Sequence, residues 1–252
     1  MPLGVALPKL EATQGYGANV VLEGNIFNES LTAAKAFAAK TGAVFIPPFD
    51  DLRVIAGQGT LGLEILEDAP DVDTIIVPIG GGGLISGVAA AVKMRAAELG
   101  RKVRIVGVQA ENAAAYPPSL KAGKPVRIDV HPTISDGIAV ATPGALNFPI
   151  IKHYVDEVVT VSDDATARAL VMLLERAKLV VEPAGAVSVA AILEGKVKNS
   201  GKTVAILSGG NIDPLLLQRV IRHGLAASDR YTNISVMLPD RPGQLVATAQ
   251  SI

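Results

Sequence analysis

Four consecutive glycines, Gly80 to Gly83, constrain the fold of this chain more than any other feature. They follow an apolar stretch at residues 74–78 and precede a longer helix-like stretch. A turn without side chains leaves its backbone N–H groups accessible, and the helix that follows adds a partial positive charge at its N-terminus. Such a turn is suited to bind a phosphate group. The alternative is a tight strand-to-helix turn that binds nothing.

Two other phosphate-binding motifs do not fit the sequence. Counted from Gly80, the last glycine of a Gly-x-Gly-x-x-Gly dinucleotide fingerprint falls on Ile85. Residues 200–203 resemble the end of a nucleotide P-loop, but Lys196 stands where that motif needs its first glycine. A single phosphate monoester is therefore the better ligand for the glycine run.

Short runs rich in Val and Ile alternate with longer helix-like segments. Uniformly apolar runs are typical of parallel strands that are buried on both faces. The alternation therefore predicts an α/β fold with an open parallel sheet and helices on both faces. The expected strands are residues 19–22, 43–46, 74–78, 103–108, 157–161 and 203–207. The expected helices are residues 29–40, 59–68, 84–99, 163–178, 184–195 and 214–224.

Two regions depart from this alternation. Residues 111–147 are rich in Pro, Gly and Ala without a clear period, which is typical of a functional loop or of short irregular elements. Residues 231–238 alternate like a half-buried strand, and residues 239–245 read as a turn into a helix. A strand and a helix stub cannot bury a core by themselves. The tail is therefore expected to be the start of a second domain.

Composition narrows the classes of function. The chain has 23 basic and 24 acidic side chains, so its charge favours neither nucleic acid nor an anionic membrane surface as a partner. It has no cysteine, which excludes disulfides, thiolate metal sites and a cysteine nucleophile. The longest apolar region, residues 74–92, contains the glycine run and predicts a strand and a helix rather than a membrane span. The N-terminus lacks a signal-peptide pattern, which favours the cytoplasm.

A second glycine turn, Ser208-Gly209-Gly210-Asn211, directly follows the expected strand at residues 203–207. In an open parallel sheet, ligands bind at the carboxyl ends of the strands. Ser208 and the tetraglycine run are therefore expected to reach one crevice from neighbouring strands. The second turn alone is compatible with a structural role, but the two turns together predict a specific site.

Three further motifs accompany the turns at residues 78–84 and 208–211: Gln58-Gly59-Thr60, Ser135-Asp136-Gly137 and Glu182-Pro183-Ala184-Gly185-Ala186. Taken together, these five motifs resemble the fold type II pyridoxal-phosphate enzymes, which have a tryptophan synthase β-like fold. Within that family the chain is most similar to the threonine ammonia-lyases, or threonine dehydratases. Residues 238–243 also resemble the start of an ACT-type regulatory domain.

The resemblance implies three parts. Residues 1–50 would be the remnant of a small cofactor and substrate domain, and residues 51–225 the large domain that binds pyridoxal phosphate. Residues 226–252 would be a linker and the truncated start of the ACT-type domain.

The resemblance also implies a cofactor site. The cofactor-binding residues would be Gly80, Gly81, Gly82, Gly83, Leu84, Ser208 and Gly209, and the pocket would include Ser135, Asp136, Gly137 and Glu182. The glycines would bind the phosphate, and Ser208 would face the pyridine nitrogen. A neutral hydroxyl there does not hold the ring nitrogen protonated, which favours β-elimination over transamination.

Some members of the resembled family also bind a cation near the glycine loop. They use a glutamate, a backbone carbonyl and a downstream aspartate. Glu111 matches the glutamate and Ala115 the carbonyl, whereas Pro117 stands at the aspartate position. The resemblance therefore supports a divalent or monovalent cation only in part, and Glu111 is equally compatible with a solvated loop carboxylate.

The reaction of the resembled family needs a lysine that binds the cofactor covalently and moves the α-proton. In that family the lysine lies upstream in a Ser-x-Lys-x-Arg-Gly segment, which this sequence does not contain. Only Lys121 and Lys202 have a serine two places before them, and neither has an arginine two places after. We therefore expect the chain to lack the catalytic lysine, to be a piece of a longer protein, and not to bind the cofactor covalently by itself.

The activity implied by the resemblance is the deamination of L-threonine to 2-oxobutanoate and ammonia, as in isoleucine biosynthesis. L-serine would give pyruvate by the same β-elimination of water. The implied partners are a small amino-acid substrate, further copies of the chain in a homo-oligomer, and an amino-acid effector. Two alternatives remain. One is an enzyme of the serine racemase type, and the other is an inactive fragment that only binds cofactor or oligomerises.

Overall fold

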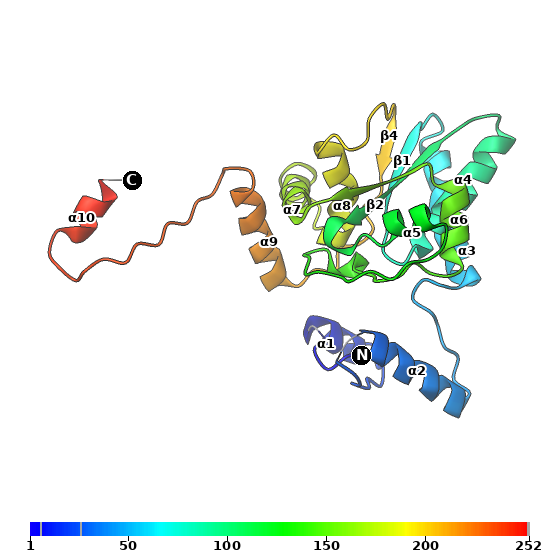
Figure 1. The fold of residues 1–252 in the computed structure, drawn as a ribbon, viewed down its shortest axis with the longest axis horizontal. Coiled ribbons are helices and arrows are strands. Elements are labelled where there is room, and N and C mark those ends of the chain that lie inside the picture. The colour runs from blue at the N-terminus through cyan, green and yellow to red at the C-terminus, as the bar shows by residue number, and fades with distance from the viewer. Residues whose placement is uncertain (6, 26, 251–252) are drawn as a thin grey trace.

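The computed structural model describes residues 1–5, 7–25 and 27–250, and its body is built around one parallel β-sheet (Figure 1). The four strands lie in the order β3-β2-β1-β4. Their bounds are β1 Thr74–Pro78, β2 Arg104–Ala110, β3 Glu157–Val161 and β4 Thr203–Ala205. All pairings are parallel, and Thr74 stands opposite Arg104 of β2 and Thr203 of β4. The α/β class expected from the sequence is confirmed.

Helices cover both faces of this sheet (Figure 1). One face carries α3 (Leu52–Asp68), α4 (Gly83–Glu98) and α6 (Asn147–Tyr154), and the other carries α7 (Asp163–Met172), α8 (Pro183–Leu193) and α9 (Pro214–Ala226). Successive residues of β1 serve different faces. Ile75 and Val77 pack in the cluster with α3 and α4, whereas Ile76 packs in the cluster with α7 and α8. The continuous apolar strands therefore reflect burial on both faces.

The helix α3 starts at Leu52, seven residues before the expected start, because Asp51 caps it. The Asp51 carboxylate accepts a hydrogen bond from the Arg53 backbone N–H at 2.8 Å. The Arg53 side chain also donates to it, which lowers the pKa of Asp51 to about 2. Further along, α3 lies very close to α4. A side chain on Gly87 would overlap the carbonyl oxygen of Ile55, so that contact requires glycine.

The helix expected at residues 163–178 forms as one run in two parts. Ser162 caps α7, since its hydroxyl accepts a hydrogen bond from Ala165 N–H at 3.1 Å. After Met172 the helix continues as a π-helical segment, η3 (Leu173–Ala177). Lys178 ends it in the left-handed conformation, with φ of 59°.

The region at residues 111–147 consists of short elements joined by irregular segments, as the sequence indicates. These are η1 (Glu111–Ala113), α5 (Tyr116–Ala122) and η2 (Asp136–Ile138), and α6 begins at the end of the region.

The N-terminal region differs from the sequence prediction. The strands predicted at residues 19–22 and 43–46 are wrong, because these residues form neither a helix nor a strand and belong to no described sheet. The helix predicted at residues 29–40 is confirmed as α2 (Phe27–Thr41), and a further helix that was not predicted, α1 (Leu7–Gly15), precedes it. Both lie below the body in Figure 1, joined to it by an extended segment. Val21 C=O accepts a hydrogen bond from the Met1 amino group at 2.7 Å, so the first of these segments pairs with the N-terminus.

The tail also differs in part. Residues 231–238 extend away from the body without a strand partner in the described chain, so the strand predicted there is wrong (Figure 1). Alternating polarity forms a strand only where a second layer buries one face, and Met237 is fully exposed. The helix predicted after the turn is confirmed as α10 (Gln244–Ala249).

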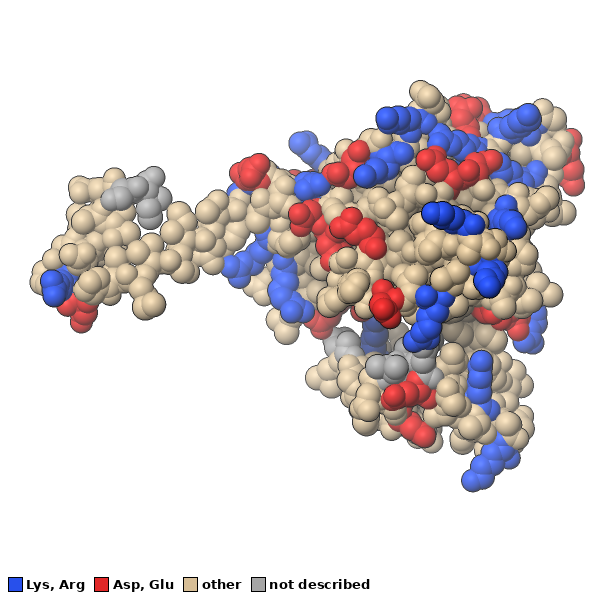
Figure 2. All heavy atoms as spheres, viewed as in Figure 1, with Lys and Arg blue, Asp and Glu red and all other residues tan. Residues whose placement is uncertain are grey.

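Within the described residues, none of the helices combines the length and the apolar character that a membrane span requires. Residues 74–92 form β1, the glycine turn and the first part of α4, as the sequence predicts. On the face shown in Figure 2, basic and acidic side chains are interspersed over the α/β body. This mixture agrees with a formal net charge of −1.

Candidate functional site

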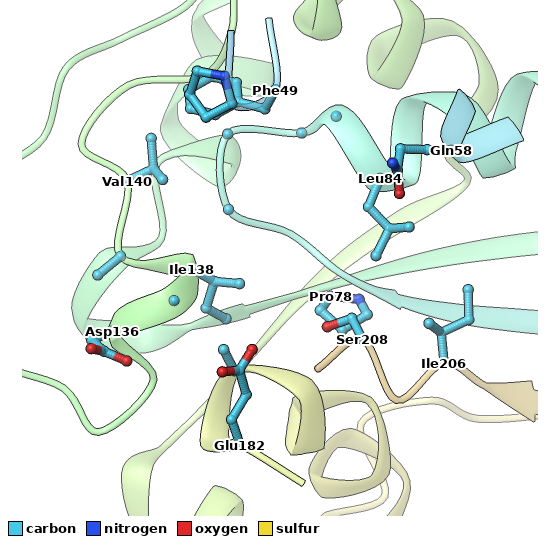
Figure 3. A pocket seen from close by; sticks show the side chains of 18 of the residues that line it. Phe49, Gln58, Pro78, Leu84, Asp136, Ile138, Val140, Glu182, Ile206 and Ser208 are labelled. Carbon is cyan, nitrogen blue, oxygen red and sulfur yellow. The ribbon is translucent and has the colours of Figure 1, made fainter. Parts of the chain in front are cut away.

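The carboxyl ends of β1 and β4 open into a cavity of about 1130 Å³ (Figure 3). Its walls come from the glycine loop, the end of β4, the segment around η2, the start of α8, and the segment that leads into α3. Leu31 of α2 contributes to the lining as well. The cavity therefore lies at the edge of the sheet where parallel α/β proteins bind ligands.

Most of the residues predicted from the sequence line this cavity. They are Gly80, Gly81, Gly82, Gly83, Leu84, Asp136, Gly137, Glu182 and Ser208. Ser135 and Gly209 lie beside lining residues rather than in the lining. Ser135 is fully buried, and its hydroxyl has no hydrogen-bond partner among the described residues.

In the glycine loop, the Gly81 carbonyl group accepts hydrogen bonds, whereas the backbone N–H groups donate none within the described chain. Gly81 C=O accepts hydrogen bonds from the Tyr116 hydroxyl and from Gly144 N–H, each at 3.0 Å. By contrast, the N–H groups of residues 80–83 donate a hydrogen bond to no acceptor within the described chain. Gly82 adopts φ of 107°, in the left-handed region that favours glycine. Consecutive N–H groups without acceptors at a helix start form a binding site for an anion.

Phe49 covers part of this loop. Its ring lies so close to Gly81 that a side chain there would overlap it, and Figure 3 shows Phe49 beside the loop. The next residue, Asp50, anchors the segment. Its carboxylate accepts hydrogen bonds from Ala145 N–H at 3.0 Å and Leu146 N–H at 2.9 Å. The segment before α3 is thereby fixed against the loop that leads into α6.

Glu182 and Ser208 reach the cavity from α8 and from the second glycine turn (Figure 3). Glu182 N–H donates a hydrogen bond to Gly209 C=O at 3.0 Å, and the Glu182 side chain lies against Gly209. Burial raises the pKa of the Glu182 carboxyl, the positive charge of Lys9 opposes this increase, and the negative charge of Asp136 adds to it. Glu182 therefore holds the second turn and presents a carboxyl with an increased affinity for a proton.

Arg127 is the basic residue of the described lining, which contains no lysine. The amine that a covalent cofactor bond requires is therefore not supplied by the described walls of the cavity.

The two residues proposed as cation ligands lie outside the cavity lining. Glu111 is exposed at the start of η1. The Ala115 carbonyl is buried and accepts hydrogen bonds from Ser119, at 3.3 Å from the backbone N–H and 2.6 Å from the hydroxyl. Among the described residues, no three His, Cys, Asp or Glu side chains gather as metal ligands would.

Sequence reasoning missed Phe49, Asp50 and Tyr116. The contact between Tyr116 and Gly81 joins residues 35 positions apart, and no local sequence pattern predicts it. The run Pro47-Pro48-Phe49-Asp50-Asp51 was the one available signal, because its prolines and acids mark a segment that cannot continue a strand or a helix.

Comparison with known proteins places this geometry in context. The family described as "Pyridoxal-phosphate dependent enzyme" matches residues 1–209. The chain is 50% identical over 246 residues to an L-threonine ammonia-lyase of Thermotoga maritima, a match that covers 97% of this chain and 60% of that protein. The chain thus spans about 60% of the length of this curated relative.

Solved structures give a similar result. A processed threonine deaminase from Solanum lycopersicum superimposes with a TM-score of 0.80 at 36% identity, covering 88% of this chain and 65% of that one. A serine racemase from maize also superimposes with a TM-score of 0.80 at 36% identity, covering 90% of this chain and 70% of that one.

Proposed function

The chain belongs to the family of pyridoxal-phosphate dependent enzymes, and we propose that its cavity binds pyridoxal 5′-phosphate with the phosphate on the glycine loop. The observation that carries this proposal is the set of loop N–H groups that have no acceptor within the described chain. A phosphate offers several acceptor oxygens, and a helix N-terminus favours its negative charge. Side chains at Gly81 or Gly82 would overlap Phe49 or Tyr116, so both positions of the loop require glycine.

We place the ring of the cofactor toward Ser208. Ser208 follows β4, the neighbour of β1, so its hydroxyl and the glycine loop line the same cavity. A hydroxyl bonded to the ring nitrogen leaves that nitrogen without a permanent charge. When bound, the cofactor supplies an electron sink for charge that develops at the α-carbon of an amino acid. Asp136 and Glu182 line the cavity as well, so its wall carries two acidic side chains.

We further propose that the whole protein deaminates L-threonine, and L-serine by the same β-elimination. The support is the 50% identity to a relative named L-threonine ammonia-lyase and the likeness to a threonine deaminase. The described residues contribute binding and orientation: the glycine loop fixes the phosphate, and Ser208 fixes the ring. Release of 2-oxobutanoate from L-threonine, measured with the whole protein, tests the activity.

The binding proposal is tested on the chain itself by equilibrium dialysis. Pyridoxal 5′-phosphate should bind more tightly than pyridoxal, which lacks the phosphate, and inorganic phosphate should compete with it. Equal affinities for the two ligands, or no competition, would overturn the placement of the phosphate on the glycine loop.

We propose that this binding is not covalent. The described cavity lining contains no lysine, and the sequence lacks the lysine segment of the resembled family. After incubation with pyridoxal 5′-phosphate and reduction with borohydride, mass spectrometry should find no stoichiometric adduct. An adduct at one lysine would refute this. Lys9, whose charge acts on Glu182, would be the first candidate for such an adduct.

A racemase is the second candidate function, because the maize serine racemase has the same TM-score as the threonine deaminase. The two activities differ in their product. Incubation of the whole protein with L-serine gives pyruvate in one case and D-serine in the other, and chiral chromatography separates them. If neither product forms and L-threonine also gives no 2-oxobutanoate, the remaining alternative is a protein that binds the cofactor without catalysis.

We also propose the division into residues 1–50, 51–225 and 226–252, with a regulatory domain that begins in the last part. Two observations support this division. The helices α1 and α2 lie outside the α/β body, and the apolar residues Ile234, Val236 and Met237 of the tail are exposed. Such residues need a partner surface. A homo-oligomer and an amino-acid effector are consistent with that need, and light scattering with and without isoleucine or valine tests both.

A further inference from the structure

Tyr116 reaches the glycine loop from inside the protein core. It is the first residue of α5 and is fully buried. Its ring packs in the cluster formed around α3 and α4, and its hydroxyl donates a hydrogen bond to Gly81 C=O at 3.0 Å. A buried phenol normally has a polar partner, and here that partner is the backbone of the loop.

Gln109 fixes Tyr116 from the other side. This fully buried residue of β2 accepts a hydrogen bond from Tyr116 N–H at 2.8 Å through its Oε1 atom. Its Nε2 atom donates to Ile79 C=O at 3.4 Å, one residue before the glycine run. Gln109 and Tyr116 thus form a buried polar connection between the end of β1, the end of β2 and the loop.

The Tyr116 hydroxyl stays a donor in the neutral pH range. Burial, together with the negative charge of Asp50, raises the pKa of the phenol. The phenol therefore remains protonated, and its hydrogen bond to Gly81 does not depend on pH in the neutral range.

The geometry of the peptide unit connects this carbonyl to the ligand side of the loop. Gly81 C=O and Gly82 N–H belong to one planar peptide unit, and in the trans form they point in opposite directions. Tyr116 and Gly144 both donate to the carbonyl, so the Gly82 N–H must point away from these two donors. Fixing the carbonyl therefore fixes the direction of a N–H group that has no acceptor in the described chain.

We propose that Tyr116 is a positioning residue, which holds the Gly81 carbonyl so that the adjoining N–H groups are presented to a phosphate group. The inference rests on the proposed function of the loop as the site of the cofactor phosphate. Gly144 N–H is a second donor to the same carbonyl, so loss of the hydroxyl loosens the loop without releasing it. The expected loss is about tenfold in affinity, as for one hydrogen bond.

The test compares Tyr116→Phe with Tyr154→Phe. Both variants lose one phenol hydroxyl, and Tyr154 packs against the same cluster without contact to the glycine loop. Equilibrium dialysis measures the affinity for pyridoxal 5′-phosphate and for pyridoxal. Tyr116→Phe should bind the phosphorylated ligand about tenfold more weakly and pyridoxal unchanged. Tyr154→Phe should match the wild type for both ligands.

A second readout needs no ligand. Hydrogen exchange of the peptide that covers residues 78–86, followed by mass spectrometry, should be faster in Tyr116→Phe than in the wild type and in Tyr154→Phe. Bound pyridoxal 5′-phosphate should also show a shifted ³¹P resonance in Tyr116→Phe alone.

The outcomes separate the two proposals. If the wild type prefers the phosphorylated ligand and Tyr116→Phe keeps the same preference, the role of Tyr116 is refuted while the phosphate site stands. An equal loss for both ligands also refutes it, because a structural role alone would weaken both. If the wild type itself shows no preference for the phosphorylated ligand, the phosphate site is refuted and the role of Tyr116 with it.

Discussion

The glycine turns after β1 and β4 end neighbouring strands of one sheet, but the protein holds them differently. The first turn follows an interior strand, and its residues 81–83 are buried. Tyr116 and Gly144 donate to its Gly81 carbonyl, and Phe49 covers it. The second turn follows an edge strand of the described sheet, and its residues Ser208 and Gly210 are exposed.

Because of this difference, we expect the two turns to bind different parts of the cofactor. Binding of a compact, charged group such as a phosphate requires several N–H groups in fixed directions, which the first turn provides. The second turn is tied to α8 mainly through Glu182, and it offers one hydroxyl toward the cavity. We therefore expect affinity for phosphate to reside in the first turn, and the second turn to affect the ring of the cofactor and the pH response.

The largest effect should come from Gly82→Ala in the first turn. The φ of 107° is unfavourable for alanine, and the added methyl group would overlap the Tyr116 hydroxyl. Strain and overpacking together should lower the free energy of unfolding by about 3 kcal/mol. Affinity for pyridoxal 5′-phosphate should fall by more than about 100-fold, because several N–H directions change at once. Urea unfolding and equilibrium dialysis measure the two losses.

Gly57→Ala is the matched control. Gly57 is an exposed residue of α3, and a side chain there would meet nothing within 4 Å. Alanine should raise the free energy of unfolding by up to about 1 kcal/mol through its helix propensity and leave the affinity unchanged. Wild-type affinity in Gly82→Ala would contradict the fixed geometry of the first turn.

Asp50→Ala should have the next largest effect, because it releases the segment that carries Phe49. Ala145 N–H and Leu146 N–H would lose their acceptor, which should lower the free energy of unfolding by about 1–2 kcal/mol. Affinity for pyridoxal 5′-phosphate should fall by about threefold as Phe49 moves. Asp68→Ala, an exposed acid at the end of α3, is the control; it should leave the affinity unchanged and should not lower the free energy of unfolding. An unchanged unfolding midpoint in Asp50→Ala would show that Asp50 is not the anchor.

Ser208→Ala tests the second turn and should have a smaller effect. Loss of one exposed hydroxyl should weaken pyridoxal 5′-phosphate and pyridoxal equally, by about threefold. Equal loss for both ligands distinguishes this variant from Gly82→Ala, which should affect the phosphorylated ligand more. A loss confined to the phosphorylated ligand would assign Ser208 to the phosphate instead of the ring.

The comparison of the turns also shows what sequence could predict. Residues 74–78 and 157–161 are strands with the expected bounds, because their apolar runs are followed by turn signals and helices that cover them. Residues 19–22 and 43–46 have similar composition but form no strand in the described sheet. A strand requires a neighbour to complete its hydrogen bonds, and a local pattern does not contain that information.

The residues of the candidate site also fall into two groups, those that the sequence predicts and those that it does not. The glycine loop and Ser208 could be placed at the cavity from sequence, because each immediately follows a strand and parallel strands end at one edge. The side chains that hold the loop could not. Phe49 and Tyr116 contact it from segments that are distant in the sequence, and packing brings them together.

The smallest predicted effect concerns Glu182→Gln, which tests whether the second turn gives the protein a pH response. Burial and Asp136 raise the pKa of Glu182 in the folded protein, whereas the charge of Lys9 acts against them. Because the folded state binds this proton more tightly than the unfolded state, the carboxyl contributes stability at low pH that is lost as the pH rises through the folded pKa. Glutamine carries no charge at any pH, so the variant should avoid that loss.

The melting temperature of Glu182→Gln should therefore equal that of the wild type near about pH 3.5, where the carboxyl is protonated in both states. Near pH 8 the variant should melt about 1 °C higher, a small difference because Glu182 is only half-buried and solvent screens its charge. Calorimetric melting at both pH values measures the difference, with Glu64→Gln, an exposed residue of α3, as a control for the loss of a carboxylate. If the variant melts lower than the wild type at pH 8, the carboxylate itself stabilises the second turn, and the proposed pH response is refuted.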